Sequence, residues 1–437
     1  MKQSKSPLVG QILASAIYAL DYMVMVIAMP KITQELHGSN WYTMGFGIFI
    51  LLTLAGVVWG GKITDKKGAH ISFYRGFVIF FVGLVVGAVA PNFFVFMLAR
   101  ALQGFGGGMA FTTVNALTNL AYDSTQRPKI IAILNTSWIV PALLAPGLGG
   151  LLLDTIGWRY IFWIQLPFVA LALYLLLPII KQYAPVNKQS IDALWPSFQL
   201  VLGATLVLFA LNEPVLSWEV LFLPFGCIIT YVPLKRLLPD GIFIAKSGLP
   251  VGLVCFALVV FIFHLSEIFI PLLLIQHYQI SSSAAGLALS VSAISWPLGA
   301  MVQARLSRTY SHGFSLKLGF FSVIILLFLM VLQSYLSWSY YFIYFLWGLT
   351  GFWLGLLKST CRTYAMDHTP KGEEGATASS KGLLDALSGG LAAGMGGMIY
   401  TLSKQDVPLS ETVSFVWVLS ALVGMLGLTL AIVRMKK

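Results

Sequence analysis

Charged residues are scarce in this chain. Only 10% of its 437 residues are Asp, Glu, Lys or Arg, whereas 58% are hydrophobic and the mean hydropathy is +0.85. A soluble fold needs more polar surface than this composition supplies, so lipid must be the solvent for most of the chain. Apolar runs of about 20 residues recur, each long enough to cross a bilayer as a helix, and they predict an all-α protein rather than a membrane barrel.

Residues that bind metals or act as nucleophiles are also few. The three cysteines, Cys227, Cys255 and Cys361, show no paired spacing, and the six histidines show no regular spacing. The chain contains no Walker-type glycine-lysine-serine loop and no polar segment long enough to form a soluble domain. We therefore expect no metal and no cofactor, and the pattern argues against an enzyme, an ATP-driven pump and a sensor with a soluble output domain.

The apolar runs predict fourteen membrane-spanning helices. They lie near 8–30, 42–61, 72–90, 93–121, 128–153, 158–180, 197–212, 217–235, 248–276, 283–304, 315–334, 338–365, 375–402 and 411–433. The runs at 197–212 and 217–235 are short. We interpret them as a membrane hairpin, but a hydrophobic linker between two six-helix halves would reduce the number of spans to twelve.

Three regions follow from these spans. We predict an N-terminal six-helix bundle over residues 1–181, a linker with two extra transmembrane helices over 182–246, and a C-terminal six-helix bundle over 247–437.

The net charge of +11 comes from basic residues that flank the predicted spans. When the N-terminus is placed inside, almost every Lys and Arg outside the spans falls on the inner side, and only Lys31, Arg159 and Lys404 fall outside. This bias predicts a multi-pass protein of the inner or plasma membrane with both termini in the cytoplasm. The basic charge is then explained by topology, and nucleic acid is not an expected partner.

Five ionisable residues away from the span ends are of interest: Asp21, Arg100, Glu267, Asp385 and His264. A charge at the centre of a membrane helix costs about 2.5–3.5 kcal/mol, so each requires a reason. His264 precedes Glu267 by three residues, which places both on one helical face. We interpret the set as a proton pathway, with Glu267 as the first candidate and Asp21 as the second. The alternative is a structural Asp21–Arg100 ion pair, with Glu267 and Asp385 capped by polar groups.

Other residues are candidates for a substrate cavity. Several tryptophans lie within spans instead of at their ends, and flexible methionines surround Asp21, although ordinary helix packing would explain those methionines equally well. The candidate cavity residues are Met25, Gln103, Asn115, Trp138, Trp296 and Trp353.

Two glycine-rich runs lie inside spans. The segment Arg100–Gly108 lets a neighbouring helix approach closely. The segment Ala145–Gly150 contains Pro146, which removes a backbone hydrogen bond and kinks the helix. The kink suits a helix that flexes, and its candidate residues are Pro146, Gly147, Gly149 and Gly150.

These motifs together resemble the major facilitator superfamily, and within it the fourteen-helix drug:proton antiporter family. The resemblance covers the first 170 residues in the order of the family. It rests on Leu20–Pro30, the loop Gly61–Gly68, Arg100–Gly104, Ala145–Gly150 and Trp158–Phe162.

The resemblance implies two six-helix bundles around a cavity, alternating access and proton-coupled export. It assigns conformational roles to Gly61, Asp65, Lys66 and Gly68, and proton coupling to Arg100. The chain departs from the family at Ala69, His70 and Ala145. Arg308 stands where the second half would match Asp65, which argues against a symmetrical charge latch.

We therefore predict a proton-coupled transporter that exports amphipathic small molecules, as multidrug efflux proteins do. The alternative is a dedicated transporter of one lipid, siderophore or metabolite on the same fold. Lys358 and Arg362, four residues apart, would favour an anionic substrate or would serve as inner-end anchors. The expected partners are a small-molecule substrate, protons and the bilayer, and we expect a monomer.

Overall fold

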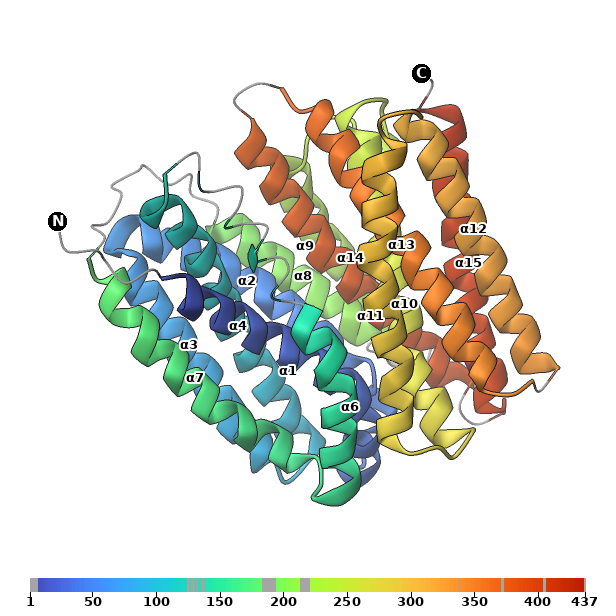
Figure 1. The fold of residues 1–437 in the computed structure, drawn as a ribbon, viewed down its shortest axis with the longest axis horizontal. Helices are drawn as coiled ribbons and strands as arrows, with labels where there is room; N and C mark the ends of the chain where they lie inside the picture. Colours follow the sequence, from blue (N-terminus) through green and yellow to red (C-terminus); the bar gives the residue numbers. More distant parts are fainter. Residues whose placement is uncertain are drawn as a thin grey trace. The chain divides into compact units, whose positions relative to one another are not determined.

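The computed structural model describes most of the chain. The described residues are 7–123, 126, 130, 133–134, 137, 139–182, 194–212, 221–336, 338–370, 373–403 and 406–435. They form α-helices, short 3₁₀ turns and connecting loops (Figure 1). The prediction of an all-α fold is confirmed.

Fourteen α-helices lie within the described residues. They are α1 (Leu8–Glu35), α2 (Met44–Lys67), α3 (Ala69–Ala88), α4 (Phe93–Ala121), α6 (Ile139–Thr155), α7 (Arg159–Ile180), α8 (Leu194–Asn212), α9 (Phe222–Leu237), α10 (Leu249–Gln276), α11 (Ser282–Leu306), α12 (His312–Tyr335), α13 (Tyr341–Asp367), α14 (Glu374–Ser403) and α15 (Leu409–Val433). Each corresponds to one predicted span, although the first part of the span predicted at 128–153 lies mainly outside the described residues.

Eleven of these helices are long and apolar enough to cross a membrane, and two shorter apolar helices lie at Leu143–Thr155 and Phe198–Leu211. The protein is therefore a multi-pass membrane protein. α9, with 16 residues, packs on α8, and an added Cβ on Gly226 would lie 2.8 Å from the backbone oxygen of Gly203.

The chain divides into two compact units, Met1–Val201 and Leu202–Lys437. In the first unit, α4 packs against α1, α2 and α3, while α7 packs against α1 and α3, and α6 against α1. In the second unit, α13 packs in the same way against α10, α11 and α12, while α15 packs against α10 and α12, and α14 against α10. Six helices of one unit thus share these packing partners with six helices of the other, which is the pattern of an internal repeat.

The register of this repeat is fixed by glycines at close helix contacts. A Cβ on Gly56 of α2 would collide with the backbone oxygen of Phe105 on α4, and a Cβ on Gly299 of α11 would collide with that of Phe352 on α13. Gly299 stands 243 residues after Gly56, and Phe352 stands 247 residues after Phe105. Positions in α2 and α4 can therefore be matched to positions in α11 and α13.

The unit boundary lies inside α8, whereas the predicted boundaries lie at residues 181/182 and 246/247. The assignment of 1–181, 182–246 and 247–437 to two bundles and a linker stays a prediction.

Local signals explain where several helices begin. The side chains of Asn92, Ser281 and Ser311 each accept a hydrogen bond from a backbone N–H of the first turn, which caps α4, α11 and α12. Gly68 joins α2 to α3 as a single residue with φ 96° and ψ 151°. Only glycine adopts that conformation without strain, so Gly68 permits the abrupt change of direction.

One end of the first unit is tied together by side chains. The carboxylate of Glu35, at the end of α1, accepts hydrogen bonds from Trp158 Nε1 at 2.7 Å and from the Arg159 guanidinium. Arg159 also donates to the backbone oxygen of Ala90, in the turn between α3 and α4. Three connections therefore meet at the same end of the helices, as alternating helix directions require.

Candidate functional site

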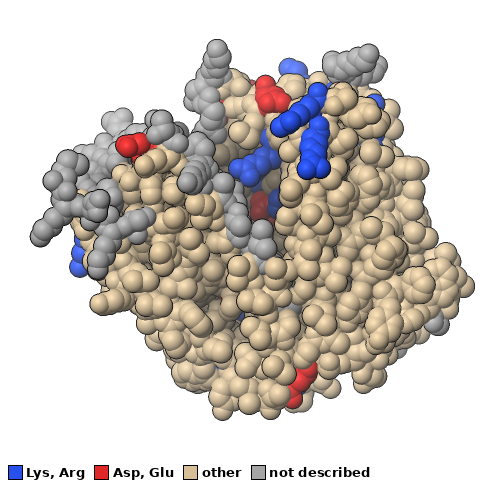
Figure 2. Space-filling model, viewed as in Figure 1, with Lys and Arg blue, Asp and Glu red and all other residues tan. Residues whose placement is uncertain are grey.

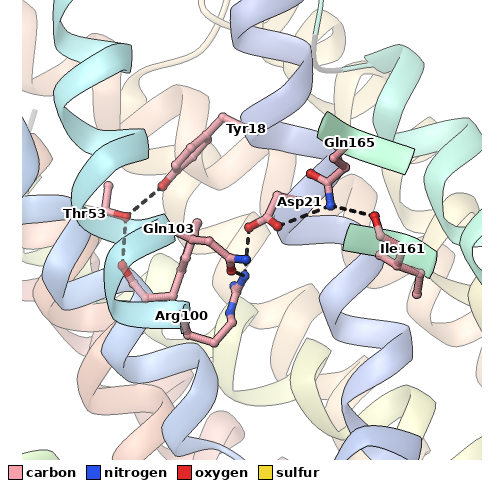
Figure 3. A network of polar contacts seen from close by, with 8 residues as sticks. Tyr18, Asp21, Thr53, Arg100, Gln103, Ile161 and Gln165 are labelled. Atoms are coloured by element: carbon pink, nitrogen blue, oxygen red, sulfur yellow. Dashed lines mark hydrogen bonds and ion pairs between the residues drawn. The ribbon is translucent and has the colours of Figure 1, made fainter. Parts of the chain in front are cut away.

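A buried polar network lies inside the first unit, among α1, α4 and α7 (Figure 3). The Nη1 atom of Arg100 donates to Asp21 Oδ2 at 2.8 Å and to Gln103 Oε1 at 2.6 Å. Gln165 Nε2 lies 3.5 Å from Asp21 Oδ1 and donates to the backbone oxygen of Ile161 at 3.1 Å. Asp21, Arg100 and Gln103 are fully buried, and Gln165 is 1% exposed. The structure therefore brings the predicted Asp21, Arg100 and Gln103 together.

The guanidinium of Arg100 has fewer partners than it can hold. Its Cζ lies 4.1 Å from the centroid of the Phe49 ring, and within the described part of the chain its Nε and Nη2 atoms are buried without a hydrogen-bond partner. A buried arginine normally uses most of its five donors. Arg100 is therefore held by one carboxylate and one amide, and it has donors free for another partner.

Glycines on α4 bring the elements of this network close. A Cβ on Gly104 would collide with the backbone oxygen of Phe49, and one on Gly108 with that of Thr53. Thr53 in turn accepts a hydrogen bond from the Tyr18 hydroxyl at 3.2 Å (Figure 3). The glycine run at 100–108 thus serves the close approach that the sequence predicted.

Sequence reasoning missed two members of the network. Gln165 is a single amide inside an apolar span, and Phe49 is one aromatic residue among many. A polar residue within a predicted span was the available signal for Gln165. Nothing in the sequence distinguished Phe49.

A second group of charges lies inside the second unit, on α13 and α14. Lys358 Nζ lies 3.2 Å from Asp385 Oδ1, and their side chains are 32% and 44% exposed. Lys381 interacts electrostatically with Lys358, Asp385 and Arg362. His264 of α10 interacts with Asp385, and its Nδ1 lies 2.9 Å from the backbone oxygen of Val260. We call Lys358, Arg362, Lys381 and Asp385 the charged cluster.

Aromatic rings border the charged cluster. Lys358 Nζ lies 5.4 Å from the centroid of the Phe256 ring and 5.7 Å from that of Trp296, and Lys381 Nζ lies 5.9 Å from Phe256. The ring of Phe263 continues this surface, with its centroid 5.0 Å from that of Trp296. Figure 2 shows the general setting: most of the visible surface carries no charge, and basic side chains gather beside acidic ones near one end.

The two units differ at the position of the buried arginine. Trp347 stands 247 residues after Arg100, at the interval that separates Gly104 from Gly351 and Gly108 from Gly355. Trp347 is fully buried, so an apolar ring fills the place that a guanidinium fills in the first unit. The two units therefore share the close packing of their helices but carry chemically different side chains at this equivalent position.

The remaining proton-pathway candidate, Glu267, lies on α10 and is 2% exposed. It shares a helical face with Phe263 and His264, which border the charged cluster.

Residues predicted to line a substrate cavity have different surroundings. Met25 of α1 is fully buried, Asn115 of α4 is exposed, and Trp296 and Trp353 are half-buried. Trp138 lies outside the described residues. Their role as a cavity lining stays a prediction.

The predicted gating residues lie on α2 and α6. Gly61 and Lys66 belong to the last turns of α2, and the Lys66 side chain is exposed. The prediction of a loop over Gly61–Gly68 is therefore wrong: the helix continues to Lys67, and Gly68 is the single residue that separates α2 from α3. On α6, an added Cβ on Gly147 would meet no atom within 4 Å, whereas one on Gly149 would lie 3.0 Å from Val24 of α1. Gly150 is buried, and the side chains of Asp65 and Pro146 are not described.

The register of the repeat also bears on the last turn of α2, which contains Asp65. Arg308 stands 243 residues after Asp65, the interval that separates Gly56 from Gly299. Residues of opposite charge therefore occupy equivalent sequence positions at the ends of α2 and α11. The second half does not repeat the acidic residue of the first half at this position.

Among the residues that the structure describes, no three His, Cys, Asp or Glu side chains lie close enough to hold a metal ion.

The profile of the Major Facilitator Superfamily matches residues 12–393, which is most of the chain. The chain belongs to this superfamily. Its members are transporters and not enzymes, which agrees with an all-helical chain whose buried charges lie inside membrane-spanning helices.

The chain is similar in sequence to other transporters, of which two are described below. One, described as multidrug transporter protein MdtP of Bacillus subtilis (strain 168), is 28% identical over 216 residues, or 48% of this chain and 39% of the relative. Another, described as a dehydrocurvularin exporter of Aspergillus terreus, is 30% identical over 194 residues, or 43% of this chain and 33% of the relative. These matches span well under half of each relative's length.

The similarity to solved structures covers nearly the whole chain. A solved structure of a POT family transporter in complex with 5-aminolevulinic acid matches it with a TM-score of 0.74 and 13% identity, covering 98% of this chain and 96% of the other. At this identity the match shows a common fold and no more, and the expected major facilitator fold is confirmed.

Proposed function

We infer that this chain is a proton-coupled secondary transporter of the fourteen-helix antiporter type, which exports amphipathic small molecules by alternating access. The observation that carries the inference is the buried Asp21–Arg100 pair, joined at 2.8 Å in a membrane-spanning unit with both side chains fully buried. Removing two charges from water costs several kcal/mol per ion, so a pair kept at this depth suggests a use for the charges.

The chemistry of the pair supports proton coupling. A proton arriving at Asp21 would remove the negative charge that holds Arg100. The guanidinium would then retain Gln103 and the Phe49 ring as its partners, and its Nε and Nη2 atoms could donate hydrogen bonds to new ones. A change of partner between α1 and α4 is a local charge event of the kind that biases a two-state bundle. Glu267, buried on α10, is the corresponding candidate in the second unit.

The internal repeat supports alternating access. The same neighbours recur among six helices of each unit, and transporters built from repeats move one repeat against the other. In this proposal the cytoplasmic end of α2, with Gly61, Asp65, Lys66 and the following Gly68, takes part in the gate, and the glycines beside Pro146 let α6 flex. Both termini are cytoplasmic in an inner or plasma membrane, and the monomer is the transporting unit.

The direction and the substrate class draw support from the relatives. One is described as a multidrug transporter protein and another as a dehydrocurvularin exporter. The second description also favours our second candidate, a dedicated transporter of one lipid, siderophore or metabolite, on the same fold.

The test is substrate-induced proton movement in liposomes that contain the purified protein and an internal pH dye. Amphipathic cations, anions and neutral compounds are added one at a time to wild type, Glu267→Gln and Asp21→Asn, with the exposed Lys317→Gln as the matched control. Proton movement that depends on one substrate class and is lost in either carboxylate variant supports the proposal. Substrate transport without proton movement in wild type would overturn proton coupling.

A further inference from the structure

The charged cluster of the second unit has an excess of positive charge. It contains three cations and one carboxylate: Lys358 and Lys381 both interact with Asp385, and Lys381 also interacts with Arg362. His264 interacts with both Asp385 and Lys358. Asp385 can neutralise one cation, so the cluster retains two uncompensated positive charges when His264 is neutral.

The cluster lies inside the membrane-spanning helices and not at their ends. Lys358 precedes the end of α13 at Asp367 by nine residues, which is about 14 Å at the rise of an α-helix. Asp385 follows the start of α14 at Glu374 by eleven residues, or about 17 Å. Anchoring at the membrane surface therefore explains Arg362, nearer the end of α13, better than it explains Lys358 and Lys381.

The same side chains are accessible. The side chain of Lys358 is 32% exposed and that of Asp385 is 44% exposed, although the Oδ1 atom that faces Lys358 is itself buried. Asp21 and Arg100 of the first unit are, by contrast, fully buried. A charge exposed to hydrocarbon would be costly, so these side chains face a space that water or a ligand enters.

An apolar surface adjoins the accessible charges. Phe256 lies below both lysines, and Trp296 and Phe263 extend the aromatic surface away from Lys358. A ligand with an anionic group and an aromatic or aliphatic body would match both parts, because ammonium groups pair with carboxylate or phosphate and the rings cover the body.

We propose that the charged cluster binds the carboxylate or phosphate of an amphipathic anion, with Lys358 as the main contact and Asp385 as the internal carboxylate that the ligand displaces. The proposal rests on the proposed transport function and narrows its substrate class. It differs from a cation-selective cavity around Asp21, since this buried carboxylate is already paired with Arg100.

The roles of the two partners predict opposite effects. Lys358→Gln removes the contact and weakens binding of the anion about tenfold, the effect of losing roughly one charge-assisted hydrogen bond. Asp385→Asn removes the competing carboxylate and strengthens binding. Lys358→Arg keeps the charge and most of the affinity.

The experiment is equilibrium binding to the full chain in phosphatidylcholine nanodiscs, without any proton gradient. The probes share one apolar body: radiolabelled 1-naphthaleneacetate, 1-naphthylethylammonium and 1-naphthaleneethanol. Lys317→Gln, an exposed lysine on α12, is the control for a lost positive charge. Unlabelled dodecyl phosphate and unlabelled naphthaleneacetate are each used to displace the radiolabelled naphthaleneacetate. Stronger displacement by dodecyl phosphate indicates a lipid-like anion, and stronger displacement by naphthaleneacetate indicates a soluble aromatic acid.

The proposal predicts that the protein binds the anionic probe more tightly than the cationic or neutral probe. The affinity for the anion should fall in Lys358→Gln, rise in Asp385→Asn and stay unchanged in Lys317→Gln. Equal binding of the cation and the anion, or a loss of anion binding in Asp385→Asn, would overturn it. This binding measurement involves no proton gradient. It can therefore detect an anion site even if the liposome experiment shows no proton-coupled transport, so a failure of one proposal is distinguishable from a failure of the other.

Discussion

At the scale of single residues, the structure separates two kinds of intramembrane charge. Asp21 and Arg100 are fully buried and paired, whereas Lys358 and Asp385 are paired and accessible. Asp21 and Asp385 looked alike in the sequence, as acidic residues inside apolar runs. Burial and partners depend on helix packing, so composition alone could not distinguish an internal pair from a pair open to ligands.

The Asp21–Arg100 pair leads to a stability prediction. Asp21→Asn leaves a buried guanidinium without its carboxylate, and breaking a buried pair typically costs about 3–5 kcal/mol. Asp21→Asn combined with Arg100→Gln removes both charges and should recover part of that loss. Thermal unfolding of the variants in identical nanodiscs measures this, with Lys317→Gln as the control. A double variant less stable than both single variants would contradict the pairing.

Gly68 supports a second prediction at this scale. Its φ of 96° and ψ of 151° are strained for any residue with a side chain, so Gly68→Ala should destabilise the protein by about 1–3 kcal/mol. Gly61→Ala is the matched control in the same motif, because its nearest neighbour would lie 3.9 Å from the new Cβ. Melting temperatures of the two variants measure the difference. Equal melting temperatures would show that the turn tolerates a side chain.

At the scale of helices, the sequence predicted the number and approximate position of the spans because length and hydropathy govern membrane crossing. The exact ends differ, as for α1, which continues to Glu35 instead of ending near residue 30. Its last turns carry Lys31, whose Nζ donates to the backbone oxygen of Leu153 at 2.7 Å, and Glu35, which binds Trp158 and Arg159. Polar residues with tertiary partners extend a helix beyond its apolar run, and hydropathy cannot detect those partners.

Close helix pairs allow a prediction about packing. A Cβ on Gly108 of α4 would collide with the backbone oxygen of Thr53 on α2, so Gly108→Ala must push two helices apart. Gly382 of α14 has no atom within 4 Å of an added Cβ, and there alanine should stabilise the helix by up to about 1 kcal/mol. Melting temperatures should fall for Gly108→Ala and hold or rise for Gly382→Ala. The reverse order would refute the close α2–α4 contact.

At the scale of the whole molecule, the family and its fold could be predicted, while the repeat register and the site chemistry could not. The motifs that carry the family resemblance lie in the first 170 residues. The second unit lacks this signal in its sequence, yet six of its helices share their packing partners with six helices of the first unit. The chemistry differs where the packing agrees, as at Arg100 and Trp347. Such a difference is visible only after the structure aligns the two halves.

Topology gives a prediction for the complete chain. If both termini are cytoplasmic, the turn at Asn92 faces outward and the turn at Thr309 faces the cytoplasm. Single cysteines at these positions, introduced with the exposed Cys227 replaced by Ser, should differ in labelling by a membrane-impermeant maleimide. Asn92→Cys should react in intact cells and Thr309→Cys only after permeabilisation. The opposite pattern would invert the topology.

The central claim, proton-driven transport of an amphipathic molecule, is tested most directly by accumulation against a gradient. Inside-out membrane vesicles containing the chain, without ATP, are given a pH gradient with an acidic interior, and the internal concentration of radiolabelled 1-naphthaleneacetate is followed, with vesicles lacking the protein as the blank. The account predicts protein-dependent accumulation above the external concentration, which collapses when nigericin removes the gradient and is lost in Glu267→Gln. Accumulation that persists with nigericin, or that never exceeds the blank for any amphipathic probe, would contradict it.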